Sequence, residues 1–314
     1  MREPGPLLDS VLALVRDAGL GPGETLERLE GGLVHDVFRV DEQLVVRVGR
    51  GPDAAGFPQT AHVLRAVAGH VSAPVLLHTD FSRQRVPANV LVYRWVEGQR
   101  LASLWPSLSM REREHYLDQV ERELRALHGI APESVPELDG LDAWPERKRR
   151  SVETSLARAA RSPAFPPERV GRMRDFFERN APALEAAPPP VLVHYDVHWQ
   201  NVVVRDGRIA ALLDFDDIRL APPEQDWWEL LFALRADEEP GVDLSWFAAH
   251  CGPDLTGPGV LERFLLDEID EIVKLMTEPL AWIGRDDAVR EADAAYRRAF
   301  ETDFFARLLA RAAP

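Results

Sequence analysis

Three polar side chains at short spacing, Asp196, Asn201 and Asp214, provide the groups needed for chemistry on a phosphorylated nucleotide. Asp196 stands two residues after His194, Asn201 follows it by five, and Asp214 begins an Asp-Phe-Asp run. One aspartate can orient or deprotonate a hydroxyl group, while an amide and a second carboxylate hold a divalent ion on the phosphates. Mg²⁺ prefers such oxygen ligands and takes the others from phosphate and water. The spacing therefore predicts a magnesium–nucleotide site.

Short apolar segments must position these residues, and their composition predicts strands at 191–193, 202–204 and 208–213. Asp206-Gly207 predicts a tight hairpin turn between the last two strands. Asp196 is then expected on the loop after the first strand, and Asn201 and Asp214 at neighbouring strand ends, close enough to share one ion. A simpler interpretation stays open, in which the aspartates only cap turns and end a strand.

The segment from His194 to Asp217 resembles the catalytic and metal motifs of the aminoglycoside phosphotransferase family. The residues that match these motifs are His194-x-Asp196, Asn201 and Leu213 to Asp217. This family includes choline kinases and other metabolite kinases and is distantly related to protein kinases. Further segments look like its nucleotide loop, its interlobe hinge, its helix ending in Leu-His and its later structural aspartate, at 31–40, 93–98, 124–128 and 224–227. The resemblance extends over most of the chain.

This resemblance implies an α+β, bilobal protein kinase-like fold, with a small N-terminal antiparallel β-sheet lobe and a larger, mainly helical C-terminal lobe. We expect a nucleotide-binding lobe at 1–96 and a catalytic and substrate-binding lobe at 97–314. Apolar patterns in the first lobe predict strands at 25–29, 37–40, 44–48 and 90–93. Helical spacing in the second predicts helices at 111–128, 168–180, 227–236, 260–276 and 288–309.

The resemblance also implies roles for the residues of the central motif. Asp196 would be the catalytic base, and Asn201 would act beside it and bind the metal together with Asp214. His194 would brace the catalytic loop as a hydrogen-bonded packing residue. Asp226 would hydrogen-bond to the catalytic-loop backbone, although a simple helix cap explains it equally well.

A second set of residues is expected to bind the nucleotide. Gly31 and Gly32 can bring backbone N–H groups close to phosphates because no side chain is in the way. By resemblance, the backbones of Arg94 and Val96 would bond to the adenine ring. Arg47 lies in the strand that supplies a phosphate-pairing lysine in kinases, and arginine can bind phosphate oxygens through two parallel hydrogen bonds.

Two departures from the family pattern concern this cation. The chain contains two lysines, Lys148 and Lys274, and both follow the expected nucleotide lobe, so a phosphate-pairing cation in that lobe must be an arginine or a histidine, and Arg47 is the candidate. Thr60 stands where the family has a helix glutamate that pairs with the cation. Asp53 or the metal-site acids could compensate for it. Without such compensation Arg47 would be held loosely and the catalytic rate would be low. A simpler alternative is that Arg47 projects into solvent from a half-exposed strand.

The acceptor is expected to be a small molecule with a hydroxyl group. Eleven residues separate Asp214 from Asp226, and Pro222-Pro223 lie among them, which leaves little room for a peptide-binding activation segment. With Mg²⁺ and ATP or GTP as donor, we weigh a kinase for an aminoglycoside-like antibiotic, conferring resistance, above a metabolite kinase acting on choline, homoserine or a sugar. A nucleotide-binding regulatory protein with little catalysis is a third reading, suggested by Arg47 and Thr60.

Charge and composition set further expectations. The net charge of −15 argues against nucleic-acid binding and fits a cationic acceptor, although many cytosolic proteins are this acidic. The acid-rich face with Asp267, Glu268, Asp270 and Glu271 is a candidate substrate wall, unless it is simply solvated. The basic run 147–150 is expected to cap or solvate a helix.

Several classes of protein are not expected. No apolar run has membrane-spanning length, and the N-terminus lacks a signal-like segment. Cys251 is the single cysteine, which excludes an intrachain disulfide and fits a reducing, cytoplasmic location. We expect a cytoplasmic monomer or homodimer.

Overall fold

The chain divides into two compact units, each described here by itself. The computed structural model describes residues 4–29, 35–50, 56–135, 138, 143–228, 230, 257–278 and 284–302. Unit 1 contains Met1–Asp139 and His194–Arg219, and unit 2 contains Gly140–Val193 and Leu220–Pro314. The segment carrying the central motif thus belongs to the same unit as the N-terminal sheet. The functional lobe boundary between residues 96 and 97 stays a prediction.

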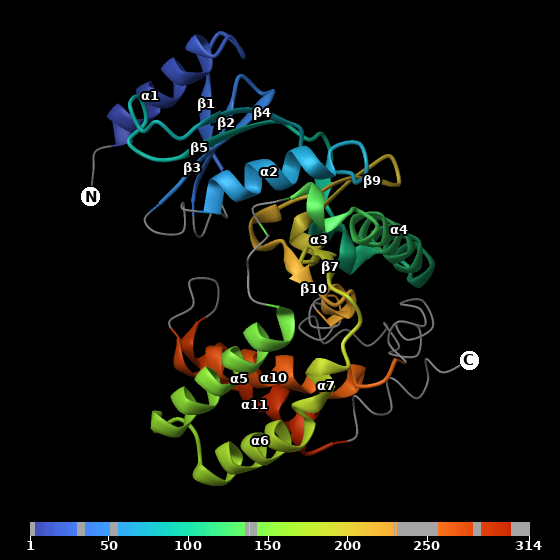
Figure 1. Cartoon of the computed structure of the whole chain (residues 1–314). Coiled ribbons are helices and arrows are strands. Elements are labelled where there is room, and N and C mark those ends of the chain that lie inside the picture. Colours follow the sequence, from blue (N-terminus) through green and yellow to red (C-terminus); the bar gives the residue numbers. More distant parts are fainter. Residues whose placement is uncertain are drawn as a thin grey trace. The chain divides into compact units, whose positions relative to one another are not determined.

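Unit 1 is built on a five-stranded antiparallel sheet (Figure 1). Its strand order is β1 (Leu26–Arg28), β2 (Asp36–Val40), β3 (Leu44–Val48), β5 (Val90–Arg94) and β4 (Leu76–Asp80). These elements confirm the strands predicted from the apolar pattern, with β4 in addition.

The two faces of this sheet have different partners. Side chains alternate along β3, so that Leu44, Val46 and Val48 are buried in a core with helix α1 (Pro4–Asp17). Burying each such aliphatic side chain stabilises the fold by about 1.5–3 kcal/mol. Arg47 must then project from the opposite face. Helix α2 (Phe57–Val67) lies beside that face (Figure 1), and the guanidinium carbon of Arg47 is 5.4 Å from the centre of the Phe57 ring.

A second sheet of unit 1 carries the predicted hairpin. Its strand order is β6 (Gln99–Arg100), β8 (Val202–Arg205) and β9 (Arg208–Leu212). The turn residues Asp206 and Gly207 have φ angles of 51° and 73°, the left-handed values that a tight hairpin turn requires. The predicted hairpin is therefore confirmed. Gln119 of helix α4 (Met110–His128) accepts a hydrogen bond from the Ile209 amide at 3.0 Å, which fixes the hairpin to the helix.

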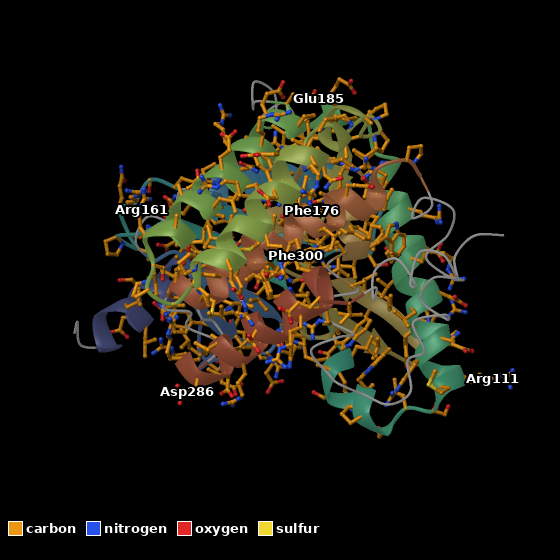
Figure 2. The ribbon with its side chains drawn as sticks, turned by 90° about the horizontal axis from the view of Figure 1, so that it is seen from below. Arg111, Arg161, Phe176, Glu185, Asp286 and Phe300 are labelled. Atoms are coloured by element: carbon orange, nitrogen blue, oxygen red, sulfur yellow. The ribbon has the colours of Figure 1, made fainter. Side chains whose placement is uncertain are left out.

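Unit 2 is mainly helical. Helix α5 (Trp144–Arg161) packs against α6 (Pro167–Asn180) and α10 (Val260–Thr277), and α10 packs against α11 (Arg285–Phe300). A short helix, α7 (Pro182–Glu185), contacts α5, α6 and α10. Strand β7 (Val191–Val193) pairs with β10 (Arg219–Ala221) in a two-stranded sheet. Phe176 of α6 and Phe300 of α11 meet edge to face at 5.7 Å (Figure 2).

Most predicted helices are confirmed, with shifted ends. Those at 111–128, 168–180 and 260–276 correspond to α4, α6 and α10. The helix predicted at 288–309 is seen as α11 as far as Phe300, and residues from 303 lie outside the described part. Of the helix predicted at 227–236, residues 227, 228 and 230 are helical and the others are not described; residues 224–226 are helical as well. The basic run 147–150 lies inside α5.

The acid-rich face predicted as a substrate wall is largely internal, so this prediction is wrong for Asp267 and Glu268. Both are fully buried within unit 2. Lys148 Nζ lies 2.5 Å from a carboxylate oxygen of Asp267 and 2.6 Å from one of Asp270, and Trp228 Nε1 donates to Glu268 at 3.2 Å. These acids bind protein partners because a buried carboxylate requires hydrogen bonds and a counter-charge.

One further expectation concerns membranes. Among the residues described, no helix combines the length and the apolar character needed to span a bilayer.

Candidate active site

The catalytic loop begins at a buried histidine. The Nε2 atom of His194 lies 2.9 Å from the carbonyl oxygen of Leu213, and its ring packs edge to face on Phe215 at 4.8 Å. Both contacts connect the start of the loop to the start of the Asp-Phe-Asp run. The bracing contacts expected of His194 are therefore present.

Asp196 and Asn201 contact each other directly. The Asn201 amide nitrogen donates to the Asp196 carboxylate at 2.7 Å and to its backbone carbonyl at 3.1 Å. A short 3-10 helix, η5 (Trp199–Asn201), turns the buried Asn201 side chain back toward the loop. Because the amide nitrogen bonds to Asp196, the amide oxygen is the atom that could bind a cation.

Asp214 lies next to Asn201 through the backbone. The Leu213 amide donates to the Asn201 carbonyl at 2.7 Å, which places the following residue beside the catalytic loop. Asp214 has a φ of 64°, a left-handed conformation that aspartate tolerates better than most residues, and it precedes the 3-10 helix η6 (Phe215–Asp217). Burial raises the pKa of Asp214 above its ordinary value, Asp216 and Asp196 raise it further, and Arg47 opposes them.

Arg47 is enclosed by carboxylates. Its side chain is only 14% exposed, its Nη1 donates to Asp216 Oδ1 at 3.2 Å and its Nη2 donates to Asp216 Oδ2. Nη2 also lies 3.5 Å from Asp214 Oδ1. The alternative in which Arg47 projects into solvent is therefore wrong, because the register of β3 directs this residue to the α2 side of the sheet. Burial alone would lower the pKa of Arg47, but neighbouring Tyr93, Asp216 and Asp214 raise it, so the cation is permanent.

Thr60 and His35 complete this cluster. Thr60, at the position where an acid was expected, donates from Oγ1 to Asp216 Oδ1 at 2.9 Å. The buried His35 places Nε2 3.5 Å from Asp216 Oδ2. Burial would raise the pKa of Asp216, but His35, Arg47 and Thr60 outweigh it and hold the pKa well below the usual range. Sequence reasoning offered the metal-site acids as possible partners of Arg47 without singling out Asp216, the second acid of the Asp-Phe-Asp run, and assigned His35 no role.

His198 is another residue that sequence reasoning missed. Its Nε2 lies 3.5 Å from Asp196 Oδ1, and its Nδ1 accepts from the Gln200 amide at 3.3 Å. The signal available was its place two residues after Asp196, on the same loop. Burial would raise the pKa of Asp196, but His198, His194 and Asn201 lower it, so this side chain is a carboxylate at neutral pH.

The other expected nucleotide contacts are described only in part. Gly31, Gly32 and Asp53 lie outside the described residues. The Arg94 amide donates to the Val75 carbonyl at 2.9 Å, so a contact between the Arg94 backbone and an adenine would use the Arg94 carbonyl oxygen. No contact of Val96 bears on its expected role, which stays a prediction.

The donor set fits a magnesium ion that is bound partly by the nucleotide. Within the described segments, no group of three or more His, Cys, Asp or Glu side chains is arranged to enclose a metal ion. One amide oxygen and one carboxylate, Asn201 and Asp214, suit Mg²⁺, which retains phosphate and water ligands. Asp226 is fully buried in unit 2, and its expected bond to the catalytic loop remains a prediction.

Comparison with solved structures shows which fold this is. The structure of aminoglycoside phosphotransferase APH(4)-Ia with ADP and hygromycin B is similar with a TM-score of 0.68 and 18% identity, over 92% of this chain and 97% of that one. The gentamicin complex of APH(2")-IIa gives 0.66 and 16% identity, over 91% and 94%. A putative aminoglycoside phosphotransferase from Ralstonia eutropha gives 0.66 and 14% identity, over 95% and 98%. The fold is thus the α+β protein kinase-like fold of these enzymes.

Sequence comparison gives the family. None of the curated proteins compared with this chain matches it. The model of the phosphotransferase enzyme family matches residues 25–263, which include the sheet of unit 1, the catalytic loop and the Asp-Phe-Asp run. The chain therefore belongs to the phosphotransferase enzyme family.

Proposed function

We propose that the protein transfers the γ-phosphate of a magnesium–nucleotide complex to a hydroxyl group of a small molecule. The observation that carries this proposal is the hydrogen-bonded group formed by Asp196, Asn201 and the strand end bearing Asp214. Phosphoryl transfer has a loose transition state, so the protein mainly positions groups and neutralises charge. A base, two metal ligands and a permanent cation in one unit are sufficient for that task.

In this mechanism each residue has one role. Asp196, whose lowered pKa keeps it ionised, would accept a hydrogen bond from the acceptor hydroxyl and take its proton as the new bond forms. Asn201 and Asp214 would hold Mg²⁺, which neutralises charge on the phosphates when bound. Arg47 would bind phosphate oxygens. The donor would be ATP or GTP, because similar folds were solved with ADP, ATP and GDP.

Aminoglycoside-like antibiotics are the first acceptor class to test. Three of the similar solved structures are complexes with gentamicin, streptomycin and hygromycin B, which favours this acceptor class. An acceptor of this kind is polycationic and needs exposed carboxylates around it. Two acids expected to supply them, Asp267 and Glu268, are buried and bonded within unit 2.

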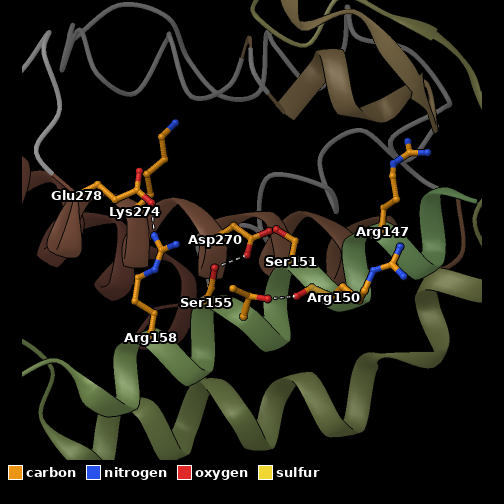
Figure 3. A pocket seen from close by; sticks show the side chains of 9 residues that line it. Arg147, Arg150, Ser151, Ser155, Arg158, Asp270, Lys274 and Glu278 are labelled. Carbon is orange, nitrogen blue, oxygen red and sulfur yellow. Dashed lines mark hydrogen bonds and ion pairs between the residues drawn. The ribbon is translucent and has the colours of Figure 1, made fainter. Parts of the chain in front are cut away.

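A groove in unit 2 favours the second candidate, a metabolite kinase. It has a volume of about 490 Å³ and lies along α5 and α10 (Figure 3). Its lining contains basic side chains, acidic side chains and hydroxyl groups, of which the charged ones are Arg147, Arg150, Arg158, Lys274, Asp270 and Glu278. Asp270 is already bonded to Lys148 and Ser155, and Glu278 to Arg158.

Lys274 also pairs with Glu271, at 3.8 Å. Basic side chains nevertheless outnumber acidic ones in the groove lining, which suits an acceptor with a carboxylate, such as homoserine, or a neutral sugar. It is less suited to choline or another cation. The third candidate, a regulatory protein with weak catalysis, loses its support, because Arg47 has a counter-ion in Asp216.

Magnesium-dependent ADP or GDP release with a panel of acceptors tests the proposal. The panel contains aminoglycosides, choline, homoserine and neutral sugars, and the Asp196→Asn variant gives the background. Release above this background with any acceptor supports the proposed reaction, and the acceptor identifies the class. Nucleotide binding without acceptor-stimulated release would favour the regulatory protein instead.

The groove has its own test. If it binds an anionic acceptor, Arg150→Ala should raise the Michaelis constant of that acceptor several-fold and leave that of the nucleotide unchanged. Arg161→Ala, at the end of the same helix and outside the groove lining, is the matched control. Equal constants in Arg150→Ala and wild type would remove the groove from acceptor binding.

A further inference from the structure

We propose that Asp216 is a positioning residue that holds Arg47 for the nucleotide phosphates, the task expected of a glutamate on the helix after β3. This inference rests on the proposed function and adds a role that the catalytic motif does not assign. It explains how a chain with Thr60 at the glutamate position can retain an oriented cation.

The carboxylate of Asp216 is engaged through both oxygens. Oδ1 accepts from Arg47 Nη1 at 3.2 Å and from Thr60 Oγ1 at 2.9 Å. Oδ2 accepts from Arg47 Nη2, and His35 Nε2 lies 3.5 Å away. Two parallel bonds between a guanidinium and a carboxylate fix the plane of both groups, which a single contact does not.

The neighbouring carboxylate is placed differently. Asp214 is 43% exposed and Asp216 is 27% exposed. Asp214 meets Arg47 only through one pair of atoms at 3.5 Å. A metal ligand must offer oxygen lone pairs to the ion, and Asp214 is the acid that can do so. The left-handed turn at Asp214 thus separates two tasks: Asp214 would bind the metal ion, and Asp216 holds the Arg47 guanidinium.

Thr60 fits this arrangement better than an acid would. A glutamate at this position would bring a second carboxylate against Asp216, and like charges in contact are unfavourable. The threonine hydroxyl instead donates to Asp216 and fixes it. Phe57, one turn earlier on α2, packs against both neighbours of Asp216, 5.4 Å from the Arg47 guanidinium and 4.6 Å from the His35 ring.

Arg47 still has donors for a phosphate. A guanidinium carries five N–H groups, and the bonds to Asp216 use one on each terminal nitrogen. The remaining N–H groups are held in a fixed plane, so fewer side-chain rotamers are lost when phosphate binds.

Nucleotide affinity without acceptor tests this role, measured by calorimetry with Mg-ATP and Mg-GTP on the full chain. Asp216→Asn should weaken binding about tenfold, because it removes a charge-assisted pair. Asp217→Asn is the matched control, since this neighbouring acid is exposed and, in the part of the chain that the structure describes, forms its ion pair with Arg219. Thr60→Val keeps the charge pair and should weaken binding about threefold. Thermal melting checks that each variant is folded.

A double-mutant cycle separates positioning from general structural damage. In the Arg47→Met background, Asp216→Asn should change nucleotide affinity less than about twofold, because its effect passes through Arg47. An equal loss in both backgrounds would overturn the proposal. So would unchanged affinity in both Asp216→Asn and Thr60→Val, while the wild type still binds nucleotide and transfers phosphate. Failure of the wild type itself to bind any nucleotide would instead contradict the proposed function.

Discussion

The ionised state and the orientation of the Asp196 carboxylate depend on residues that are close to it in the chain. Asn201 donates to it at 2.7 Å, and His198 lies 3.5 Å from its other oxygen. Burial opposes ionisation of Asp196, but these contacts lower its pKa. A carboxylate held in this way can receive the hydroxyl of an acceptor without first losing a proton.

Removing this carboxylate should stop the reaction. We expect Asp196→Asn to lower kcat about 10²- to 10⁴-fold, the usual contribution of a positioned base, and to change nucleotide affinity less than about twofold. Acceptor-stimulated nucleotide diphosphate release and calorimetry measure the two quantities. Asp206→Asn, at an 89% exposed turn position, is the control. Near-normal turnover in Asp196→Asn would remove it from the role of base.

The residues that could be predicted from sequence are those whose partners lie close in the chain. The spacing of Asp196, Asn201 and Leu213 reflects one loop and one hairpin, so their proximity follows from local geometry. The partner of Arg47 could not be found in this way, because Asp216 lies 169 residues further along the chain. The missing glutamate indicated that a partner was needed, and Asp53 and the metal-site acids were the candidates, but the sequence did not single out Asp216, which pairs with Arg47.

At the scale of elements, alternation and turn chemistry were sufficient for most strands, whereas β4, β6 and β10 were not predicted. The hairpin of β8 and β9 and the alternation along β3 follow from apolar periodicity and from Asp206-Gly207. Helix α5 was not predicted, because its buried stripe is interrupted by a basic run. The residues of that stripe are Trp144, Lys148, Val152, Leu156 and Ala159.

Gly98 should be irreplaceable in the segment before β6. Its φ is 144°, and a Cβ atom there would lie 2.5 Å from the Val204 carbonyl oxygen. We expect Gly98→Ala to destabilise the protein by about 2 kcal/mol or more, because it combines backbone strain with a clash against β8. Gly171→Ala in α6, where a Cβ meets nothing within 4 Å, should be neutral or stabilising by up to about 1 kcal/mol. Urea unfolding compares the two variants.

The turn before β1 should show pH-dependent stability. The carboxylate of Asp41 accepts from the amides of Gly23, Glu24 and Thr25 at 2.6, 2.9 and 3.0 Å. Burial would raise the pKa of Asp41, but these bonds outweigh it and lower the pKa below 3.8. The stability that this group adds is therefore complete above its unfolded pKa and is lost as pH falls through the folded pKa.

Variants at position 41 separate the effect of the carboxylate charge from that of the backbone conformation. Asp41→Asn keeps one acceptor and tolerates the left-handed φ of 48°, whereas Asp41→Ala loses both advantages. At pH 7 we expect Asp41→Ala to cost about 1–2 kcal/mol and Asp41→Asn less. The difference in the free energy of unfolding between wild type and Asp41→Asn should decrease as the pH falls from about 5 to about 3. A difference in unfolding free energy that does not change with pH would contradict the assigned hydrogen bonds.

At the scale of the whole molecule, the division of the chain could not be predicted. Unit 1 joins residues before 140 to the segment 194–219, and unit 2 is composed of the two remaining segments. Contacts between distant segments decide this division, and periodicity reports only on near neighbours. The buried ion pairs of unit 2 could not be predicted for the same reason, since Lys148 and Asp267 are far apart in sequence.

One buried ion pair of unit 2 should dominate its stability. Arg263 Nε lies 2.5 Å from Glu224 Oε1, and both side chains are about 1% exposed. Arg263→Met should destabilise by about 3–5 kcal/mol, because it leaves a buried carboxylate without a counter-charge. The double variant Arg263→Met/Glu224→Gln should recover much of this loss. Arg149→Ala breaks the exposed pair with Glu185 and should cost less than about 1 kcal/mol. Chemical denaturation curves measure all three.

The replacement of lysine by Arg47 has a consequence for proteomic detection. Acyl-phosphate analogues of ATP label kinases by acylating an amine beside the bound triphosphate. A guanidinium whose pKa is raised offers no free nucleophile, and the two lysines of the sequence, Lys148 and Lys274, both belong to unit 2. A survey based on amine-reactive nucleotides would therefore overlook the β3 position of this chain even when the chain binds the probe.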